Sequence, residues 1–360
     1  MTDTAAAVIV PAPDFGAELA FWQGQGFRLE AIWPADDPAV AVVSRGAMTL
    51  RLEREATGAP AVHLAGEGAA QVSPGGTRVR FGPMVPALSM PKVQHGFGVR
   101  RLADGAPWVI GRAGMQYRDL VPDRLGGAIV ASHIRIPDGG PVPDMVHYHT
   151  VGFQLIFCHK GWVDLVYEDQ GPPFRLDAGG CVVQPPEIRH RVLCASDEIE
   201  VVEIGVPAVH VTTIDHGMRL PNDRLARDRL FQGQRFVWQK ADAAVWTPAR
   251  QAGFVSRDTT IAENTGDVAG VRVLRFDGGP TAPFRHGGEI YFTFVRAGMC
   301  VLRTSGEDHT LTAADAVVLP PGQDAQYQLC SDDLELLEVT LPGRPSFVQT
   351  APGKPYSGFR

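Results

Sequence analysis

The sequence predicts a mainly β protein with two successive, related β-barrel domains after a small α+β module. Three observations lead to this fold class. Short runs of Val, Ile, Leu and Phe recur along the 360 residues, separated by many of the 40 glycines and 29 prolines, as expected for strands joined by tight turns. A pattern in the middle of the chain returns near its end. The first 55 residues place one helix-like segment among strand-like runs.

The composition limits the classes of partner. Hydrophobic residues make up 44% and charged residues 20% of the chain, which is ordinary for a soluble globular protein. The net charge is -7 and no basic block offsets it, so we expect neither a nucleic-acid nor a membrane partner. No apolar run approaches the roughly 18 residues of a membrane span. The N-terminus has no basic segment before an apolar run, so we expect no signal peptide and a cytoplasmic protein.

The cysteines argue against a disulfide framework or a cysteine-based zinc site, because they are odd in number and widely scattered. They are Cys158, Cys181, Cys194, Cys300 and Cys330. Cys158 and Cys181 lie in apolar strand-like runs, where we expect core positions.

Residues 1–60 predict the small α+β module. A strand at 7–10 and an amphipathic helix at 15–24 precede strands at 27–32, 39–44 and 48–53. This βαβββ order, carried by AELAFWQGQGF and WPADDPAVAVVSRGAMTLRLE, resembles one module of the vicinal-oxygen-chelate (glyoxalase-like) superfamily. The resemblance implies a His on the first strand and a carboxylate on the last. The first strand has no His, and Glu53 alone cannot hold a metal, so we expect a structural or docking module.

Residues 61–115 are rich in Gly and Pro and contain few strong strand runs. We expect a connecting arm that packs on the barrels.

An internal repeat defines the rest of the chain. GMQYRD at 114–119 returns as GFVSRD at 253–258, and FRLDAGGCVVQPPE at 174–187 returns as HTLTAADAVVLPPG at 309–322. Between them, GGAIVASHIRIPDGGPVP at 126–143 returns as AGVRVLRFDGGPTAP at 269–283. Copies about 140 residues apart indicate duplicated domains. We expect barrels at 116–215 and 251–345, a linker at 216–250 and a tail at 346–360.

Histidines in the first copy predict a metal site. In HYHTVGFQLIFCHKGW, His147 and His149 are two residues apart, so their side chains share one face of a strand, while Tyr148 faces away. Gln154 lies an odd number of residues beyond His149, so the strand must break at 150–152 before Gln154 can join that face. GGCVVQPPEIRHRVL supplies His190 on a later strand, after a Pro-Pro turn.

This pattern resembles the cupin signature. That family's first motif is His-x-His, three or four residues, an acid, six residues and Gly. Here it is His147, His149, Gln154 and Gly161. Its second motif is Gly, five residues and Pro-x-Gly-x-x-His, and Gly179, Pro185 and His190 stand at that spacing. The resemblance implies two tandem jelly-roll (double-stranded β-helix) barrels.

The resemblance also implies one divalent transition metal, held by His147, His149 and His190, with Gln154 in the fourth ligand's place. Gln154 replaces the usual Glu, and Glu187 replaces the turn Gly. Some sugar-acid cupins have a similar His-His-Gln-His set, so Gln154 is either a ligand or a hydrogen-bond donor to the ligands. Imidazole suits Fe, Zn, Ni and Cu. We favour Fe(II), with Zn, Ni or Mn as alternatives. Three imidazoles and an amide leave the ion's charge uncompensated, which favours a small anionic substrate.

Other polar residues of the first copy receive weaker predictions. The candidates for acid–base or substrate-anchoring roles are Arg135, Tyr167, Glu187 and Arg189. His133, His159, His210 and His216 are expected to be structural or solvent-facing.

The second copy has lost the site. Aligning Gly298 with Gly161 puts Phe284, His286 and Tyr291 at the positions of His147, His149 and Gln154, while Ala325 takes the place of His190. We expect this barrel to cover a hydrophobic face of the first or to form a homodimer interface.

Three functions remain open from the sequence. The first is a non-haem Fe(II) dioxygenase that uses O2 on a small anionic aromatic or keto acid. Its chain layout resembles the gentisate-type ring-cleaving dioxygenases, which lack the N-terminal module. The second is a non-redox isomerase, lyase or hydrolase with Zn, Ni or Mn, acting on a sugar-acid-like substrate. The third is a metal or metabolite sensor without turnover.

Overall fold

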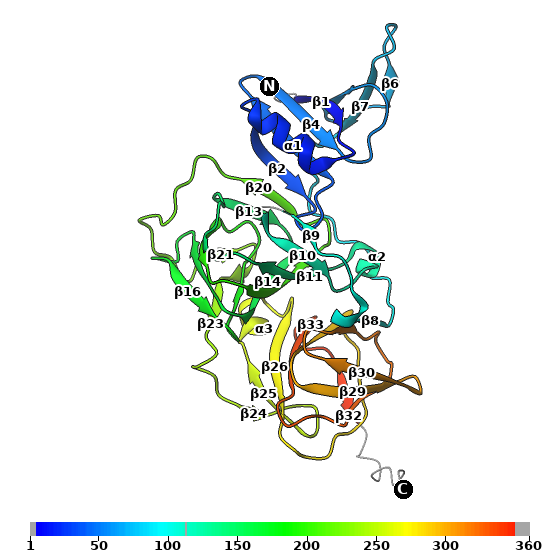
Figure 1. Cartoon of the computed structure of the whole chain (residues 1–360), viewed down its shortest axis with the longest axis vertical. Helices are drawn as coiled ribbons and strands as arrows, with labels where there is room; N and C mark the ends of the chain where they lie inside the picture. The colour runs from blue at the N-terminus through cyan, green and yellow to red at the C-terminus, as the bar shows by residue number, and fades with distance from the viewer. Residues whose placement is uncertain (1–4, 112–113, 350–360) are drawn as a thin grey trace.

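The N-terminal module has the predicted βαβββ order. The computed structural model (Figure 1) describes residues 5–111 and 114–349. In the module, β1 (Ala6–Pro11) and α1 (Phe15–Gly24) precede β2 (Arg28–Trp33), β3 (Val40–Arg45) and β4 (Met48–Glu53). The strands are ordered β2-β3-β4-β1, with β1 parallel to β4. The Asp14 side chain caps α1 by accepting from the Ala17 amide. The helix packs its Phe15 side on the sheet.

The segment predicted to be a connecting arm contributes strands to three parts of the molecule. β5 (Ala61–Ala65) pairs with β1, and β7 (Arg78–Gly82) with β6 (Gln71–Val72) continues that sheet as the hairpin at the top of Figure 1. Beyond them, β8 (Gly98–Arg100) pairs with β31 of the second barrel, and β9 (Val109–Ile110) pairs with β10 of the first. A short 3-10 turn, η1, lies between them at Leu102–Asp104.

The first barrel consists of two facing antiparallel sheets. One has the order β16-β15-β18-β13-β20, formed by Phe174–Asp177, Trp162–Tyr167, His190–Ala195, His147–Thr150 and Val211–Ile214. The other has the order β17-β14-β19-β11-β10, formed by Cys181–Val183, Phe153–Lys160, Ile199–Val206, Val130–Ile136 and Gln116–Asp119. The short strand β12 (Gly140–Pro141) pairs with β18, and α2 (Arg124–Gly127) precedes β11. Because β20 also pairs with β2, the module and the barrel share one sheet.

The second barrel repeats this arrangement and confirms the duplication. Its sheet β25-β26-β33-β28-β31 comprises Phe254–Asp258, Gly270–Phe276, Glu335–Leu341, Ile290–Ala297 and Ala316–Val318. Its sheet β30-β29-β32-β27-β34 comprises Glu307–Thr312, Met299–Thr304, Ala325–Gln328, Phe284–His286 and Phe347–Gln349. The helix α3 (Ile261–Asn264) stands where α2 stands in the first barrel.

The segment between the barrels adds four short strands. β21 (Leu230–Phe231) and β22 (Gln234–Arg235) form a hairpin, while β23 (Val237–Gln239) pairs with β17 and β24 (Thr247–Pro248) with β25. Each barrel therefore receives an edge strand from this segment.

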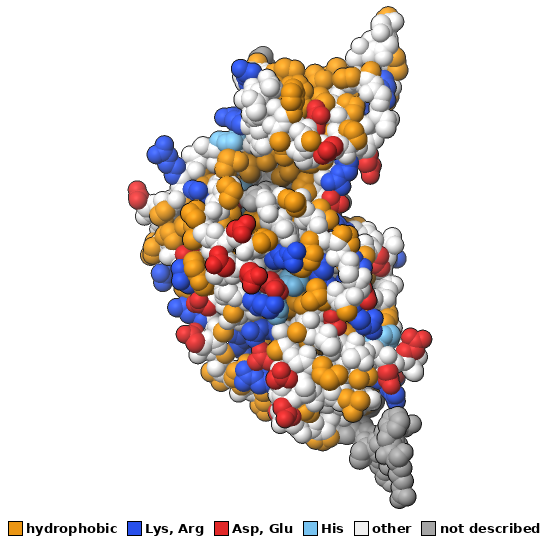
Figure 2. Space-filling view, in the orientation of Figure 1, with side chains coloured by type: hydrophobic (Ala, Val, Ile, Leu, Met, Phe, Trp, Pro, Cys, Tyr) orange, Lys and Arg blue, Asp and Glu red, His pale blue; other side chains and the backbone are white. Residues whose placement is uncertain are grey.

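The two barrels pack through one shared hydrophobic core. Side chains of β14 and β19, such as Phe157 and Ile204, belong to the same buried cluster as Phe292, Phe294 and Val339 from β28 and β33. The second barrel thus covers an apolar face of the first, which is one of the two roles expected from the sequence. On the face seen in Figure 2, acidic and basic side chains are scattered among hydrophobic ones. In the described part of the chain, no helix is long and apolar enough to cross a bilayer.

Candidate metal centre

Three imidazoles converge inside the first barrel. His147 on β13 stands directly opposite His190 on β18, and His149 lies two residues further along β13. Their ring centroids are 4.2 Å apart for His147–His190 and 5.0 Å apart for the other two pairs. One nitrogen from each ring lies within 4.8 Å of the others, and each residue is at most 4% exposed. The fold therefore brings together the three residues that the sequence spacing predicts to be ligands.

The hydrogen bonds of these rings suit metal binding. Nδ1 of His147 lies 2.7 Å from the Met145 carbonyl oxygen, and Nδ1 of His190 lies 3.0 Å from that of Ile188. A carbonyl oxygen only accepts, so both Nδ1 atoms carry the hydrogen and both Nε2 atoms present a lone pair. Nδ1 of His149 lies 3.0 Å from the Thr212 hydroxyl, which can fix that ring in the same way. The donor set therefore fits a divalent transition metal.

A buried carboxylate supports the strand that carries His147. Asp144 accepts hydrogen bonds from the amides of Met145 and Val192, at 2.9 Å each. Its Oδ1 also lies 3.5 Å from Nδ1 of His147. Asp144 therefore fixes the start of β13 against β18 and adds negative charge behind one imidazole.

Gln154 reaches the same cavity from the opposite sheet. The strand breaks at Val151 and Gly152, as the spacing requires, and β14 begins at Phe153. The Gln154 side chain lines the cavity with the three histidines, and its Nε2 donates to Oε1 of Glu203 at 2.6 Å. The atom of Gln154 that would bind a cation is its amide oxygen, whereas the atom bonded to Glu203 is its amide nitrogen. This geometry is compatible with both predicted roles, a ligand and a hydrogen-bond donor.

The structure adds Glu203 and His210 to the site. Glu203 on β19 lines the cavity, and one oxygen of its carboxylate groups with His149 and His210 within 4.8 Å. His210 is 1% exposed, and its ring centroid lies 4.5 Å from that of His149, so it does not face solvent. The site therefore contains a carboxylate beside the imidazoles. The sequence analysis considered only three imidazoles and an amide, and so did not include this negative charge. Glu203 interrupts the apolar run at 201–206 of β19, and this interruption is visible in the sequence.

None of the four predicted acid–base or anchoring residues lines the cavity. Tyr167 contacts residues that do line it: its ring stacks on His190 at 5.4 Å, and its hydroxyl accepts from Nε2 of Gln184 at 2.7 Å. Burial raises the pKa of Tyr167 and keeps the phenol protonated. Arg135 lies over the Trp108 ring at 4.1 Å and donates to Gln116.

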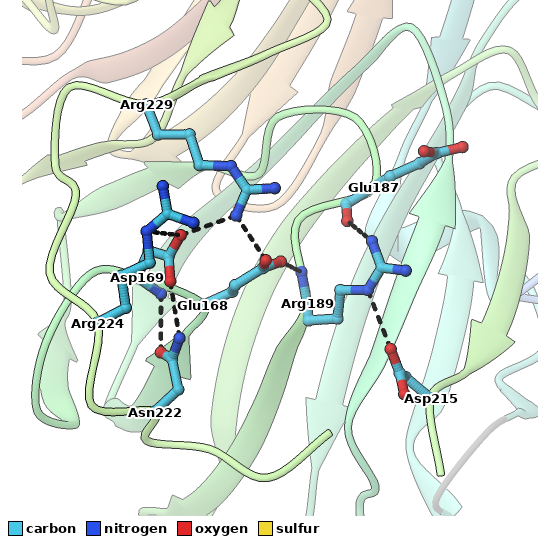
Figure 3. A network of polar contacts seen from close by, with 8 residues as sticks. All are labelled: Glu168, Asp169, Glu187, Arg189, Asp215, Asn222, Arg224 and Arg229. Atoms are coloured by element: carbon cyan, nitrogen blue, oxygen red, sulfur yellow. Dashed lines mark hydrogen bonds and ion pairs between the residues drawn. The ribbon is translucent and has the colours of Figure 1, made fainter. Parts of the chain in front are cut away.

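Arg189 and Glu187 belong to a polar network outside the cavity (Figure 3). Arg189 pairs with Asp215 at 3.1 Å, lies over the Tyr148 ring and donates to the Glu187 carbonyl. The Glu187 carboxylate points away from the network. Their catalytic roles, like those of Tyr167 and Arg135, stay predictions.

The same network fastens the segment after β20 to the end of β15. Arg229 bridges Glu168 and Asp169 at 2.5 and 2.8 Å, and Asn222 bonds Asp169 (Figure 3). Glu168 also accepts from the Arg189 amide, next to His190. This network therefore holds the start of β18 from the surface side.

Three further histidines and two of the cysteines have structural environments. His133 and His159 are buried between the barrels, where both rings contact Phe294. His216 binds the Leu29 carbonyl of the N-terminal module at 2.9 Å. Cys158 and Cys181 are fully buried, as expected, and burial raises the pKa of both thiols to about 12.

The second barrel keeps the register of the site but not its ligands. Phe284 stands opposite Ala325 as His147 stands opposite His190, and Tyr291 takes the place of Gln154, as the repeat predicts. The Tyr291 hydroxyl donates to buried Glu338, which also accepts from Gln251 and Arg250. Among the described residues, the clusters of metal-ligating side chains lie in the first barrel. A bonded polar cluster occupies the equivalent place in the second.

Comparisons with known proteins establish the fold. No family model and no curated protein matches the chain. The oxalate decarboxylase–formate complex of Lactobacillus farciminis matches with a TM-score of 0.52 and 11% identity, over 72% of this chain and 91% of that one. Salicylate 1,2-dioxygenase from Pseudaminobacter salicylatoxidans matches with a TM-score of 0.51 and 16% identity, over 72% and 90%. A mutant of the salicylate 1,2-dioxygenase in complex with gentisate gives 0.53 and 16%, over 72% and 87%.

These likenesses show that the chain has the cupin fold, in its two-barrel form. They do not extend to the glyoxalase-like kinship of residues 1–60, which stays a prediction.

Proposed function

We propose that the protein is a metal-dependent cupin enzyme, a non-haem Fe(II) dioxygenase that acts on a small anionic aromatic or keto acid. The observation that carries the proposal is the convergence of His147, His149 and His190, with the Nδ1 atoms of His147 and His190 bonded to carbonyl oxygens. Such second contacts orient metal-ligating imidazoles and raise their basicity.

Each part of the site has a chemical task. A bound Fe(II) supplies Lewis acidity and the capacity for redox chemistry with O2. The three histidines hold the ion with neutral donors, and Glu203 offsets part of its charge. Apolar side chains from both sheets, among them Ile134, Ile156 and Leu165, line the cavity and exclude water from the bound substrate. Tyr167 stays protonated and supports Gln184 and His190 from behind.

Glu203 also favours a second candidate, a non-redox isomerase, lyase or hydrolase that uses Zn, Ni or Mn. A carboxylate that lines the cavity beside His149 can accept a proton from a bound substrate without any change in oxidation state. Activity that persists without oxygen distinguishes this candidate from a dioxygenase.

Elemental analysis of the purified protein, combined with oxygen uptake on a panel of aromatic and keto acids, tests the proposal. We expect one divalent metal per chain and oxygen consumption with the iron-loaded protein. The His147→Ala/His190→Ala double variant should lose the metal. The matched control is Phe284→Ala/Ala325→Gly, which alters the equivalent positions of the second barrel and should keep the metal. Full metal occupancy in the histidine variant would contradict the assignment.

A further inference from the structure

His149 belongs to two groups of metal-ligating atoms. With His147 and His190 it forms the candidate metal centre described above. With Glu203 and His210 it forms a second group, whose ligand atoms also lie within 4.8 Å of one another. All members of the second group are buried, and the ring centroids of His149 and His210 are 4.5 Å apart. The second group therefore offers the nitrogen and oxygen donors that divalent transition metals take in proteins.

The separation of Glu203 and His210 fits a shared ion. Nε2 of His210 lies 3.7 Å from Oε1 of Glu203. Nitrogen and oxygen ligands lie about 2.1 Å from a bound zinc ion, so two ligands of one such ion are at most about 4.2 Å apart. The same Oε1 accepts from the amide of Gln154, but a carboxylate has about four lone-pair sites. The bond from Gln154 therefore fixes the carboxylate and leaves it able to bind an ion.

The backbone beside Glu203 makes room for His210. Gly205 stands directly opposite Gln154 in the sheet. A Cβ atom at Gly205 would lie 3.1 Å from Nδ1 and 3.3 Å from Cγ of His210, which is closer than side chains normally pack. The second barrel has Thr340 at this register position, opposite Tyr291. The missing side chain at Gly205 thus admits the imidazole in the first barrel, and the second barrel does not keep this feature.

The equivalent carboxylates of the two barrels have different neighbours. In the second barrel, Glu338 pairs with Arg250 at 2.7 Å and with Arg272 at 3.5 Å. Both guanidinium groups are permanent cations. In the first barrel, Glu203 lies instead with two imidazoles, each of which can give a nitrogen lone pair to an ion. A metal ion beside Glu203 would thus take the place that the guanidinium groups have beside Glu338.

From these contacts we infer that His149, Glu203 and His210 form a second metal position, which alternates with the three-histidine position. A neutral imidazole has one nitrogen lone pair, so His149 serves one ion at a time. The kind of metal decides between the positions, because a carboxylate suits Mn(II) and imidazoles suit Ni(II). Mn(II) therefore binds with Glu203 and His210, whereas Ni(II) binds with His147 and His190. The inference goes beyond the proposed function, which concerns the three-histidine position alone.

Calorimetry on the metal-free full chain measures the affinities for Mn(II) and Ni(II), and the ratio of the two is the readout. His210→Ala should lower the Mn(II)/Ni(II) affinity ratio by about tenfold or more, and His190→Ala should raise it by about tenfold or more, because each change removes a ligand from one position only. His149→Ala should weaken the binding of both metals. The matched control is His286→Ala, which removes a buried imidazole at the equivalent of His149 in the second barrel and should leave both affinities unchanged.

The crossed design separates the inference from the proposed function. A partly unfolded variant loses both metals alike, so the ratio does not depend on folding. The inference fails if His210→Ala leaves the ratio unchanged or raises it, or if the wild type binds Mn(II) and Ni(II) together. A ratio that falls in His210→Ala but stays constant in His190→Ala supports the second position and overturns the three-histidine position. A wild-type chain that binds neither metal overturns both.

Discussion

The amide of Gln154 donates to the carboxylate of Glu203 at 2.6 Å, and this bond joins β14 to β19 inside the first barrel. The second barrel has the same relationship, because Tyr291 on β28 donates to Glu338 on β33 at matching register. In the first barrel the bonded carboxylate lies beside a group of imidazoles. In the second it lies among Gln251, Arg250 and Arg272, which satisfy its charge without a metal.

Glu203→Gln should weaken metal binding by about tenfold or more, because the site loses the carboxylate that offsets the ion's charge. Competition with a chelator measures this affinity. The control is Glu338→Gln, the equivalent change in the second barrel, which should leave metal affinity unchanged. Equal metal affinity in wild type and Glu203→Gln would remove Glu203 from the site's electrostatics.

Asp144→Asn should lower metal affinity by about 10- to 100-fold while the barrel stays folded. The change removes the charge behind His147 and converts one carboxylate oxygen that accepts an amide bond into a donor. Chelator competition, with thermal unfolding of the metal-free protein as the check on folding, measures the effect. Loss of stability in the metal-free protein without a change in affinity would assign Asp144 to the backbone alone.

Phe294→Ala should cost about 3–5 kcal/mol of unfolding free energy, because Phe294 is fully buried in the core that both barrels share. We expect this loss of stability to affect both barrels together. Urea unfolding followed by tryptophan fluorescence reports whether a change in the second barrel reaches the rest of the chain, because all six tryptophans lie before residue 251. An unchanged first-barrel transition would show that the barrels unfold independently.

The sequence contains most of what fixes the fold and the histidine cluster. The repeat follows from the similarity of two parts of the sequence. The βαβββ order and the alternation of His147, Tyr148 and His149 follow from local periodicity, which a single helix or strand displays by itself. Glu203 and His210 do not, because their place beside His149 depends on how β19 and β20 are registered against β13 and β14. The contribution of residues 61–115 to three separate sheets does not follow from local periodicity either. Its strands are short and are stabilised by partners elsewhere in the chain.

The contact between the barrels predicts acid sensitivity. Burial, with His133 nearby, lowers the pKa of His159 to about 4. Burial alone would raise the pKa of Glu200, but hydrogen bonds from His133 and Lys160 outweigh it and lower the pKa to about 2. An unfolded His binds its proton near pH 6.5 and an unfolded Glu near 4.5. Between the native and the unfolded pKa of each group, the unfolded chain therefore binds more protons than the native chain. The free energy of unfolding consequently decreases as pH falls.

We accordingly expect the free energy of unfolding to decrease as pH falls from 6.5 to 4 through His159, and from 4.5 to 2 through Glu200. His159→Gln cannot take up this proton, so between pH 6.5 and 4.5 its stability should fall less than that of the wild type, by on the order of 2 kcal/mol. Urea titrations of the two metal-free proteins at several pH values measure this difference, and effects of the metal-site histidines cancel in it. Parallel pH profiles would show that His159 titrates as it does in the unfolded chain. His159 would then not contribute to the acid sensitivity.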